Sequence, residues 1–126
     1  MDAMMQEISL RADYLESKKI SSIYFGGGTP SLLKEKDLRG FIDKIQQTFD
    51  VAADAEITLE SNPDDLSAAN LKLFKSASIN RLSIGTQSFF DAELKLMNRS
   101  HNAEEAKSSI MRAQDAGFEN LTIDLI

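Results

Sequence analysis

The sequence predicts an α/β fold with about four parallel strands and with helices on the outer face of their sheet. Two observations lead to this prediction. Short strand-like runs alternate with helical segments along the chain, which is typical of parallel strands joined by right-handed crossovers. Within the strands, apolar residues alternate with polar ones, whereas a doubly wound sheet needs strands that are apolar on both faces. A slice of a barrel with a polar interior therefore fits best.

The first half of the chain is expected to contain two helices and two strands. Apolar residues at spacings of three and four predict a helix over residues 2–18 and a second helix over 34–49. Between them, the apolar run that ends in three glycines predicts a strand over 21–26. In the run "EITLES" Ile57 and Leu59 share one face and Thr58 and Glu60 the other, which predicts a strand over 56–61.

The second half is expected to contain three helices and two strands. Ser67 and Asp91 are the expected N-caps of the first two helices, and Asn102 with Glu105 forms a capping-box pattern at the start of the third. Gly117 is expected to end that helix. The predicted ranges are helix 67–77, strand 81–89, helix 91–97, helix 102–117 and strand 121–126.

Composition limits the classes of protein that remain. The chain has 126 residues, 42% of them hydrophobic and 27% charged, which suits a single domain over residues 1–126. Its net charge of -6 argues against a nucleic-acid surface, and no apolar run approaches the ~20 residues of a membrane span. The absence of cysteine excludes disulfides and thiolate metal sites within the chain. A cytoplasmic location is the default expectation.

Both ends of the sequence point to a fragment. The chain begins with a helix, although an α/β unit usually opens with a strand, and it ends inside its last strand. We therefore expect a slice of a larger barrel or sheet with elements missing at both ends. Such a slice leaves two strand edges exposed, which favours self-association.

Polar residues gather where the predicted strands end. The glycines at 26–28, Glu60, Gln87 and Asp124 lie at or near the carboxyl ends of strands. In α/β barrels and open sheets this rim is where ligands bind. Glycines there let a ligand approach the backbone because no Cβ blocks it. Asp124 adds weight, because a buried carboxylate on the inward face of an apolar strand needs partners.

Each of these residues also has a purely structural interpretation. The stretch "GGGTPS" is compatible with a tight turn, and it lacks the third glycine of G-x-G-x-x-G and the lysine of G-x-x-x-x-G-K. Glu60 taken alone is more typical of a capping or solvated carboxylate. Arg99 is either a surface charge or the counter-ion of a rim carboxylate. His101, the single histidine, is expected to be structural or exposed in a loop.

Four blocks of sequence carry a resemblance to a known family. They are "IYFGGGTPSLL", "ITLESNPDDL", "INRLSIGTQSFFDAELKLMNRSH" and "LTIDLI". In this order and spacing they resemble the radical S-adenosylmethionine (radical SAM) enzymes of the oxygen-independent coproporphyrinogen III oxidase family. The resemblance covers essentially the whole chain. The motifs Glu-Ser-Asn-Pro, Gln-Ser-Phe and Arg-Ser-His within these blocks resemble those of the haem-chaperone-like branch more closely than those of the true oxidases.

The resemblance implies a partial (β/α)6 barrel and two cofactors. S-adenosylmethionine binds in this family beside a [4Fe–4S] cluster held by three cysteines in a C-x3-C-x2-C loop after the first strand. This chain has no cysteine, so the first strand with its cluster loop is expected upstream of residue 1 and the last strand downstream of residue 126. The fragment alone is expected to be inactive. In the family, an electron from the cluster cleaves the sulfonium and yields a 5′-deoxyadenosyl radical that abstracts hydrogen.

The resemblance also implies roles for residues at matching positions near the methionine end of the cofactor. Gly27, Gly28 and Thr29 resemble the backbone edge that binds this end. Peptide groups at a strand end suit its ammonium and carboxylate. Glu60 resembles the carboxylate that contacts the cofactor through a charge-assisted hydrogen bond.

Three further positions resemble polar contacts to the remainder of the cofactor. Gln87 and Asp124 resemble the residues that fix the nucleoside, with Asp124 suited to the ribose hydroxyls. Arg99 resembles the residue that pairs with the cofactor's carboxylate. These residues place the cofactor and exclude water, while the cofactor and the cluster supply the chemistry.

Three functions remain open at the level of sequence. The first is radical chemistry on a porphyrinogen in haem biosynthesis, as a coproporphyrinogen dehydrogenase. The second is a haem chaperone of the same family, which delivers haem without oxidase turnover. The third is an unrelated (β/α) barrel enzyme whose rim binds a sugar or phosphate, with Glu60 and Asp124 as an acid/base pair. The expected partners are the small-molecule cofactor and a porphyrin or haem.

Overall fold

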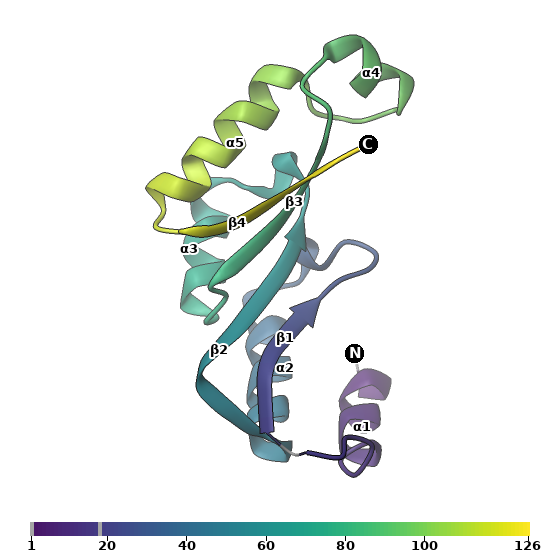
Figure 1. Cartoon of the computed structure of the whole chain (residues 1–126), viewed down its shortest axis with the longest axis vertical. Helices are drawn as coiled ribbons and strands as arrows, with labels where there is room; N and C mark the ends of the chain where they lie inside the picture. The colour runs from purple at the N-terminus through teal and green to yellow at the C-terminus, as the bar shows by residue number, and fades with distance from the viewer. Residues whose placement is uncertain (1, 18) are drawn as a thin grey trace.

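Four parallel strands form one sheet in the computed structural model, which describes residues 2–17 and 19–126 (Figure 1). The strands are β1 (Lys19–Phe25), β2 (Asp50–Ser61), β3 (Arg81–Gln87) and β4 (Asn120–Leu125). They pair in chain order, so each strand lies beside the one before it. The predicted α/β class with parallel strands is confirmed.

Helices precede, connect and cover these strands (Figure 1). They are α1 (Asp2–Leu10), α2 (Glu35–Thr48), α3 (Ala68–Ser76), α4 (Asp91–Leu96) and α5 (Ala103–Asp115). Two short 3-10 turns also occur: η1 (Pro30–Leu32) follows β1 after the glycine turn 26–29, and η2 (Pro63–Asp65) follows β2 after one residue. None of the helices in the described part of the chain has the length and apolarity that a bilayer crossing requires.

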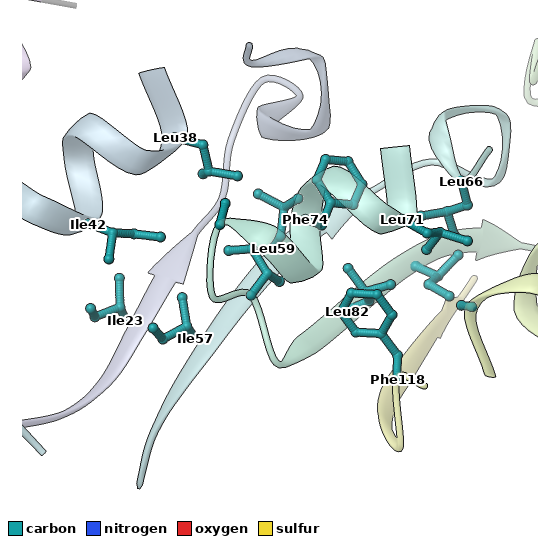
Figure 2. Close-up of a cluster of buried hydrophobic side chains, with 14 residues drawn as sticks. Ile23, Leu38, Ile42, Ile57, Leu59, Leu66, Leu71, Phe74, Leu82 and Phe118 are labelled. Carbon is teal, nitrogen blue, oxygen red and sulfur yellow. The ribbon is translucent and has the colours of Figure 1, made fainter. Parts of the chain in front are cut away.

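One face of the sheet is apolar and packs against α2, α3 and α5 (Figure 2). Leu38 of α2 and Phe74 of α3 are fully buried against strand residues such as Leu59. Burial of one such side chain stabilises the fold by about 1.5–3 kcal/mol. The buried residues of this core are Ile23, Leu38, Ile42, Ile57, Leu59, Leu66, Leu71, Phe74, Ala77, Ile79, Leu82, Ile84, Ala113 and Phe118. Helices therefore lie on the apolar face, as predicted, and the opposite face carries the polar strand residues.

The apolar residues of β4 follow this pattern only at its start. Leu121 packs against the core. Ile123 and Leu125, which the alternation places on the same face, are 38% and 59% exposed. No helix in the described part of the chain buries this later part of the strand. The general expectation that helices cover the apolar face of the sheet is therefore wrong for the end of β4.

The start of β2 differs most from the predicted strand boundaries, because strand pairing decides it. β2 begins at Asp50 instead of residue 56, and its first residues pair with the start of β1 through Lys19↔Asp50 and Ile20↔Val51. The register then shifts, and pairing resumes at Ser22↔Glu56. The intervening residues have little strand propensity, so their extended conformation depends on the neighbouring strand.

The first helix is shorter than predicted. α1 ends at Leu10. The hydrogen bond from Arg11 N to Glu7 O is of the α-helical i to i−4 kind, whereas the next one, from Ala12 N to Ser9 O, is an i to i−3 bond. No residue of α1 is buried, and short helices need tertiary packing to persist. The last residue of the predicted range, 18, lies outside the described residues.

Two of the three predicted helix caps are confirmed. The Ser67 side chain accepts a hydrogen bond from Asn70 N, and Asn102 forms a reciprocal capping box with Glu105. The third prediction is wrong, because Asp91 lies inside α4 as its first residue. Its Oδ1 instead accepts a hydrogen bond from Ala103 N at 2.8 Å, which fixes the start of α5 against the start of α4.

Candidate functional site

A polar pocket of about 200 Å³ lies at the carboxyl ends of the strands. It is lined by Gly27, Thr29, Glu60, Ser61, Asn62, Ser83, Gly85, Gln87 and Asp124. Five of the seven residues singled out from the sequence are in this set. They come from the ends of all four strands or from the turns that follow them. The location agrees with the rule that ligand sites of parallel α/β folds lie at this edge.

Gly28 borders a second cavity instead. This cavity has a volume of about 330 Å³ and a more apolar lining, which includes Phe25, Leu33 and Phe41. Thr29 lines both cavities, so the turn after β1 separates them. The peptide bond between Gly28 and Thr29 is cis.

Glu60 holds the glycine turn in place. Its Oε2 accepts a hydrogen bond from Gly27 N at 3.0 Å, and its Oε1 accepts one from the Tyr24 hydroxyl at 2.7 Å. Both carboxylate oxygens are therefore engaged with the strand and turn of β1. Hydrogen bonds to a charged acceptor are stronger than neutral ones. Glu60 is thus neither a helix cap nor a freely solvated group.

The three glycines of the turn have different reasons to lack a side chain. A Cβ on Gly26 would lie 2.8 Å from Tyr24 Cε1 and 3.0 Å from Glu60 Oε1, so these two side chains would have to shift to admit it. Gly27 has a φ of +96°, which favours glycine. A Cβ on Gly28 would meet no atom within 4 Å. Gly28 therefore borders open space that the protein itself does not fill.

Asp124 and Ser83 form the side of the pocket near β4. The Ser83 hydroxyl donates to Asp124 Oδ2 at 3.1 Å. The Asp124 side chain is exposed, so the expectation of a buried carboxylate in need of several partners is wrong. An exposed carboxylate with a single serine donor keeps acceptor capacity for a ligand.

Arg99 lies beside the pocket in the loop after α4. Its Nη2 donates to Gly85 O at 2.7 Å and to Asn62 Oδ1 at 2.8 Å, two residues of the pocket lining. It is partly exposed. Because both of these acceptors are neutral, Arg99 is not the counter-ion of a rim carboxylate in the part of the chain that the structure describes. His101 is structural as predicted, since its side chain is buried.

Sequence reasoning missed three polar residues of this region as site residues. Tyr24 and Ser83 lie on the polar face by strand alternation, which is the signal that would have found them. Asn62 belongs to a stretch with strong turn chemistry, and its contact with Arg99 follows only from the folded structure. Two of the three bind the carboxylates that were predicted.

The hydrogen bond to Glu60 raises the pKa of Tyr24 above the ordinary 10.0, because ionisation would remove the donated proton; burial adds a smaller effect. The neutral form is favoured in the folded state, so this contribution to stability is present below pH 10.0 and is lost as the pH rises through the raised pKa. We expect the tyrosinate absorbance of wild type, after subtraction of the absorbance of Tyr24→Phe, to titrate with a midpoint above pH 10.0. The same difference in a Glu60→Ala background should return toward the ordinary value. A midpoint that Glu60→Ala leaves unchanged would contradict this assignment.

The charge of the pocket suits a cationic ligand. Its lining contains two carboxylates, Glu60 and Asp124, and no lysine or arginine. It does not suit an iron–sulfur cluster, which proteins hold mainly through cysteine thiolates. The chain has no cysteine, and in the part that the structure describes no group of three or more His, Asp or Glu side chains is placed to hold a metal ion.

Fold and pocket together define a segment of a parallel α/β barrel with a polar pocket at the carboxyl ends of its strands. The sequence profile of the radical SAM superfamily matches residues 4–126. The chain therefore belongs to the radical SAM superfamily.

Individual relatives place the chain more closely. It is 38% identical over 126 residues to the heme chaperone HemW of Lactococcus lactis, covering 100% of this chain and 33% of that protein. It is 38% identical over 109 residues to the bovine radical S-adenosyl methionine domain-containing protein 1, mitochondrial, covering 86% and 25%. The chain thus spans a third or less of these curated relatives.

A solved structure gives the same result. The coproporphyrinogen III oxidase HemN of Escherichia coli, described as a radical SAM enzyme, superposes with a TM-score of 0.85 at 32% identity, covering 98% of this chain and 29% of that one. The predicted resemblance and the predicted fragment of a radical SAM barrel are confirmed. The alternative of an unrelated barrel with a sugar or phosphate rim is wrong. Membership of the superfamily implies S-adenosylmethionine and a [4Fe–4S] cluster in the full-length proteins.

Proposed function

We propose that the polar pocket binds S-adenosylmethionine, in a protein that acts in porphyrin or haem metabolism. The observation that carries this proposal is the turn at Gly27, which lines the pocket: a Cβ there would meet no atom within 4 Å, and Glu60 Oε2 holds its backbone N. A side-chain-free edge lets a ligand pair with peptide groups directly. The two carboxylates of the lining suit the positive sulfonium and ammonium of this cofactor.

Each end of the cofactor has matching groups in the pocket. The turn with Gly27, Gly28 and Thr29 suits the methionine end, whose ammonium and carboxylate pair with peptide groups. Asp124 keeps acceptor capacity for ribose hydroxyls, and Gln87 offers an amide to the nucleoside. Arg99, whose guanidinium binds Gly85 O beside the pocket, suits the cofactor's carboxylate.

The described residues bind and orient the cofactor and exclude water. When bound beside a reduced cluster, S-adenosylmethionine supplies a 5′-deoxyadenosyl radical. We place the cluster in a part of the protein outside these 126 residues, because this chain offers no thiolate. Residues 1–126 then form one unit, the core of the barrel, to which the first strand with its cluster loop and the last strand are added. This unit alone is inactive.

Within the family, the haem chaperone is the function that we favour over the oxidase. The Lactococcus lactis relative at 38% identity is a heme chaperone, whereas the solved neighbour at 32% identity is a coproporphyrinogen oxidase. The partner is accordingly haem or a porphyrin, and the net charge of -6 argues against a nucleic-acid partner.

We propose a cytoplasmic location, although the bovine relative is named as mitochondrial. The isolated fragment is proposed to self-associate through the edges of β1 and β4.

One experiment separates the two functions of the family. The whole protein is reconstituted anaerobically with iron and sulfide, then given a reductant, S-adenosylmethionine, and either coproporphyrinogen III or haem. Stable haem binding with little 5′-deoxyadenosine supports the chaperone. Porphyrinogen-dependent 5′-deoxyadenosine with protoporphyrinogen as product would replace the chaperone by the oxidase.

Replacing Gly28 with valine in the whole protein is expected to weaken S-adenosylmethionine binding at least tenfold, by roughly 1.4 kcal/mol or more, with an unchanged melting temperature. A Cβ at this position would meet no protein atom within 4 Å, so the substitution should act mainly on what occupies the cavity space beside the turn. Isothermal titration calorimetry gives the affinity, and Gly28→Ala should give a smaller loss. Gly27→Val is a poorer test, because the φ of +96° adds backbone strain. Wild-type affinity in a folded Gly28→Val variant would refute the binding edge.

A further inference from the structure

Three consecutive residues after α4 contact the ends of two strands. Arg99 Nη2 donates to Gly85 O at 2.7 Å at the end of β3. The Ser100 hydroxyl donates to Asp64 Oδ2 in the turn after β2. His101 Nε2 lies 3.0 Å from Thr86 O, also near the end of β3. The segment 99–101 therefore joins β3 to the turn that follows β2.

His101 makes its contact inside the protein. Its side chain is 3% exposed. A carbonyl oxygen only accepts hydrogen bonds, so the contact with Thr86 O requires the proton on Nε2. The other nitrogen, Nδ1, has no hydrogen-bond partner among the described residues and lies 3.9 Å from Asp64 Oδ1. The Nε2 bond is therefore the hydrogen bond through which this buried ring contacts the pocket region.

The carbonyl that His101 binds also closes a tight turn around Gln87. Ser88 N donates to Thr86 O at 2.9 Å, and Gln87 between them has a φ of +67°. A bond between residues two apart across a positive φ defines a γ-turn of the rare, strained kind. The pairing of β3 with β4 is irregular here, because the register shifts between Ile84 and Gln87. Non-glycine residues hold such a conformation only where their surroundings enforce it.

We propose that His101 is a positioning residue for the pocket, which fixes the Thr86 carbonyl and so holds Gln87 in the conformation that lines the pocket. Gln87 lines the pocket directly, whereas His101 is not part of the lining. Its action therefore passes through the backbone of residues 86–88. The inference rests on the proposed function, since it assigns His101 a role in S-adenosylmethionine binding.

The first test measures the turn itself, in the whole protein without ligand. Replacing His101 with alanine should increase the hydrogen-exchange rate of the Ser88 amide, which donates to the same carbonyl. His101→Gln places an amide nitrogen near the position of Nε2, so it should keep slow exchange. His101→Asn is too short to do so and serves as a second loss variant if the alanine protein is unstable. Unchanged exchange in the alanine and asparagine variants would overturn the proposal.

The second test measures affinity for S-adenosylmethionine and asks whether His101 acts through Gln87. His101→Ala should weaken binding about tenfold, roughly the loss of one hydrogen bond, and His101→Gln should restore most of the affinity. Gln87→Gly removes the side chain but tolerates the positive φ. Adding His101→Ala to Gln87→Gly should cost no further affinity, because the residue that it positions is absent. Independent, additive losses would overturn positioning through Gln87.

A wild-type protein that fails to bind S-adenosylmethionine would refute the proposed function, while the exchange measurement would still decide whether His101 holds the turn.

Discussion

Replacing Glu60 with alanine is expected to weaken S-adenosylmethionine binding in the whole protein about 100-fold, or roughly 2.8 kcal/mol. The substitution removes the acceptor of Gly27 N and of the Tyr24 hydroxyl, so the glycine turn loses its attachment to β2. It also removes one of the two carboxylates that face a cationic ligand. Each lost charge-assisted hydrogen bond is worth about 1.5–3 kcal/mol, less at an exposed site. Calorimetric titration of the reconstituted protein measures the loss.

Two matched variants separate the parts of this effect. Glu60→Gln keeps the shape and one acceptor oxygen but removes the charge, so it should lie between wild type and alanine. Tyr24→Phe removes only the hydroxyl and leaves the bond to Gly27 N, so it should weaken binding by less than Glu60→Gln. A Glu60→Ala protein that folds and binds with wild-type affinity would show that this carboxylate serves the fold alone.

Replacing Gly26 with valine is expected to lower both the stability and the affinity of the protein. The first added carbon lies 2.8 Å from Tyr24 Cε1 and 3.0 Å from Glu60 Oε1, distances that force both side chains to move. Tyr24 is 56% exposed and has room to move, so the loss of stability should lie below the range of about 1–3 kcal/mol that is typical of insertions into a packed core. Urea denaturation should show a corresponding fall in the free energy of unfolding, and titration should show at least tenfold weaker binding.

Gly28→Val is the matched control for this prediction. It adds the same side chain two residues further along the same turn, where nothing lies within 4 Å. It should weaken binding without lowering the free energy of unfolding. Equal losses of stability in both variants would contradict the assignment of distinct roles to the two glycines.

Much of the fold was accessible from the sequence because each strand combines one apolar face with one polar face. Ile57 and Leu59 identify the buried face of β2, and the glycines identify the end of β1. The boundary errors have one physical origin. The first six residues of β2 adopt an extended conformation next to β1, and α1 ends where no packing supports it. Pairing and packing are tertiary effects that local patterns do not encode.

The site was predictable to the extent that strand ends define it. Glu60 and Asp124 were found because they end strands on the polar face. The bond between Glu60 and Tyr24 and the bond from Arg99 to Gly85 O join residues far apart in sequence. The positive φ of Gln87 carries no local signal, because glutamine does not favour that conformation. These contacts decide how the pocket is built, and they follow only from the folded chain.

Strand pairing in chain order lets the sheet grow at one edge as the polypeptide leaves the ribosome. Each new strand joins the edge that the preceding strand left free, so no earlier pairing has to open, and folding can keep pace with synthesis. The pocket is lined by residues at or just after the ends of all four strands, from Gly27 to Asp124. A nascent chain released before β4 has emerged therefore holds the glycine turn and Glu60 but lacks the opposite wall. The polar pocket is therefore complete only when β4 has been made.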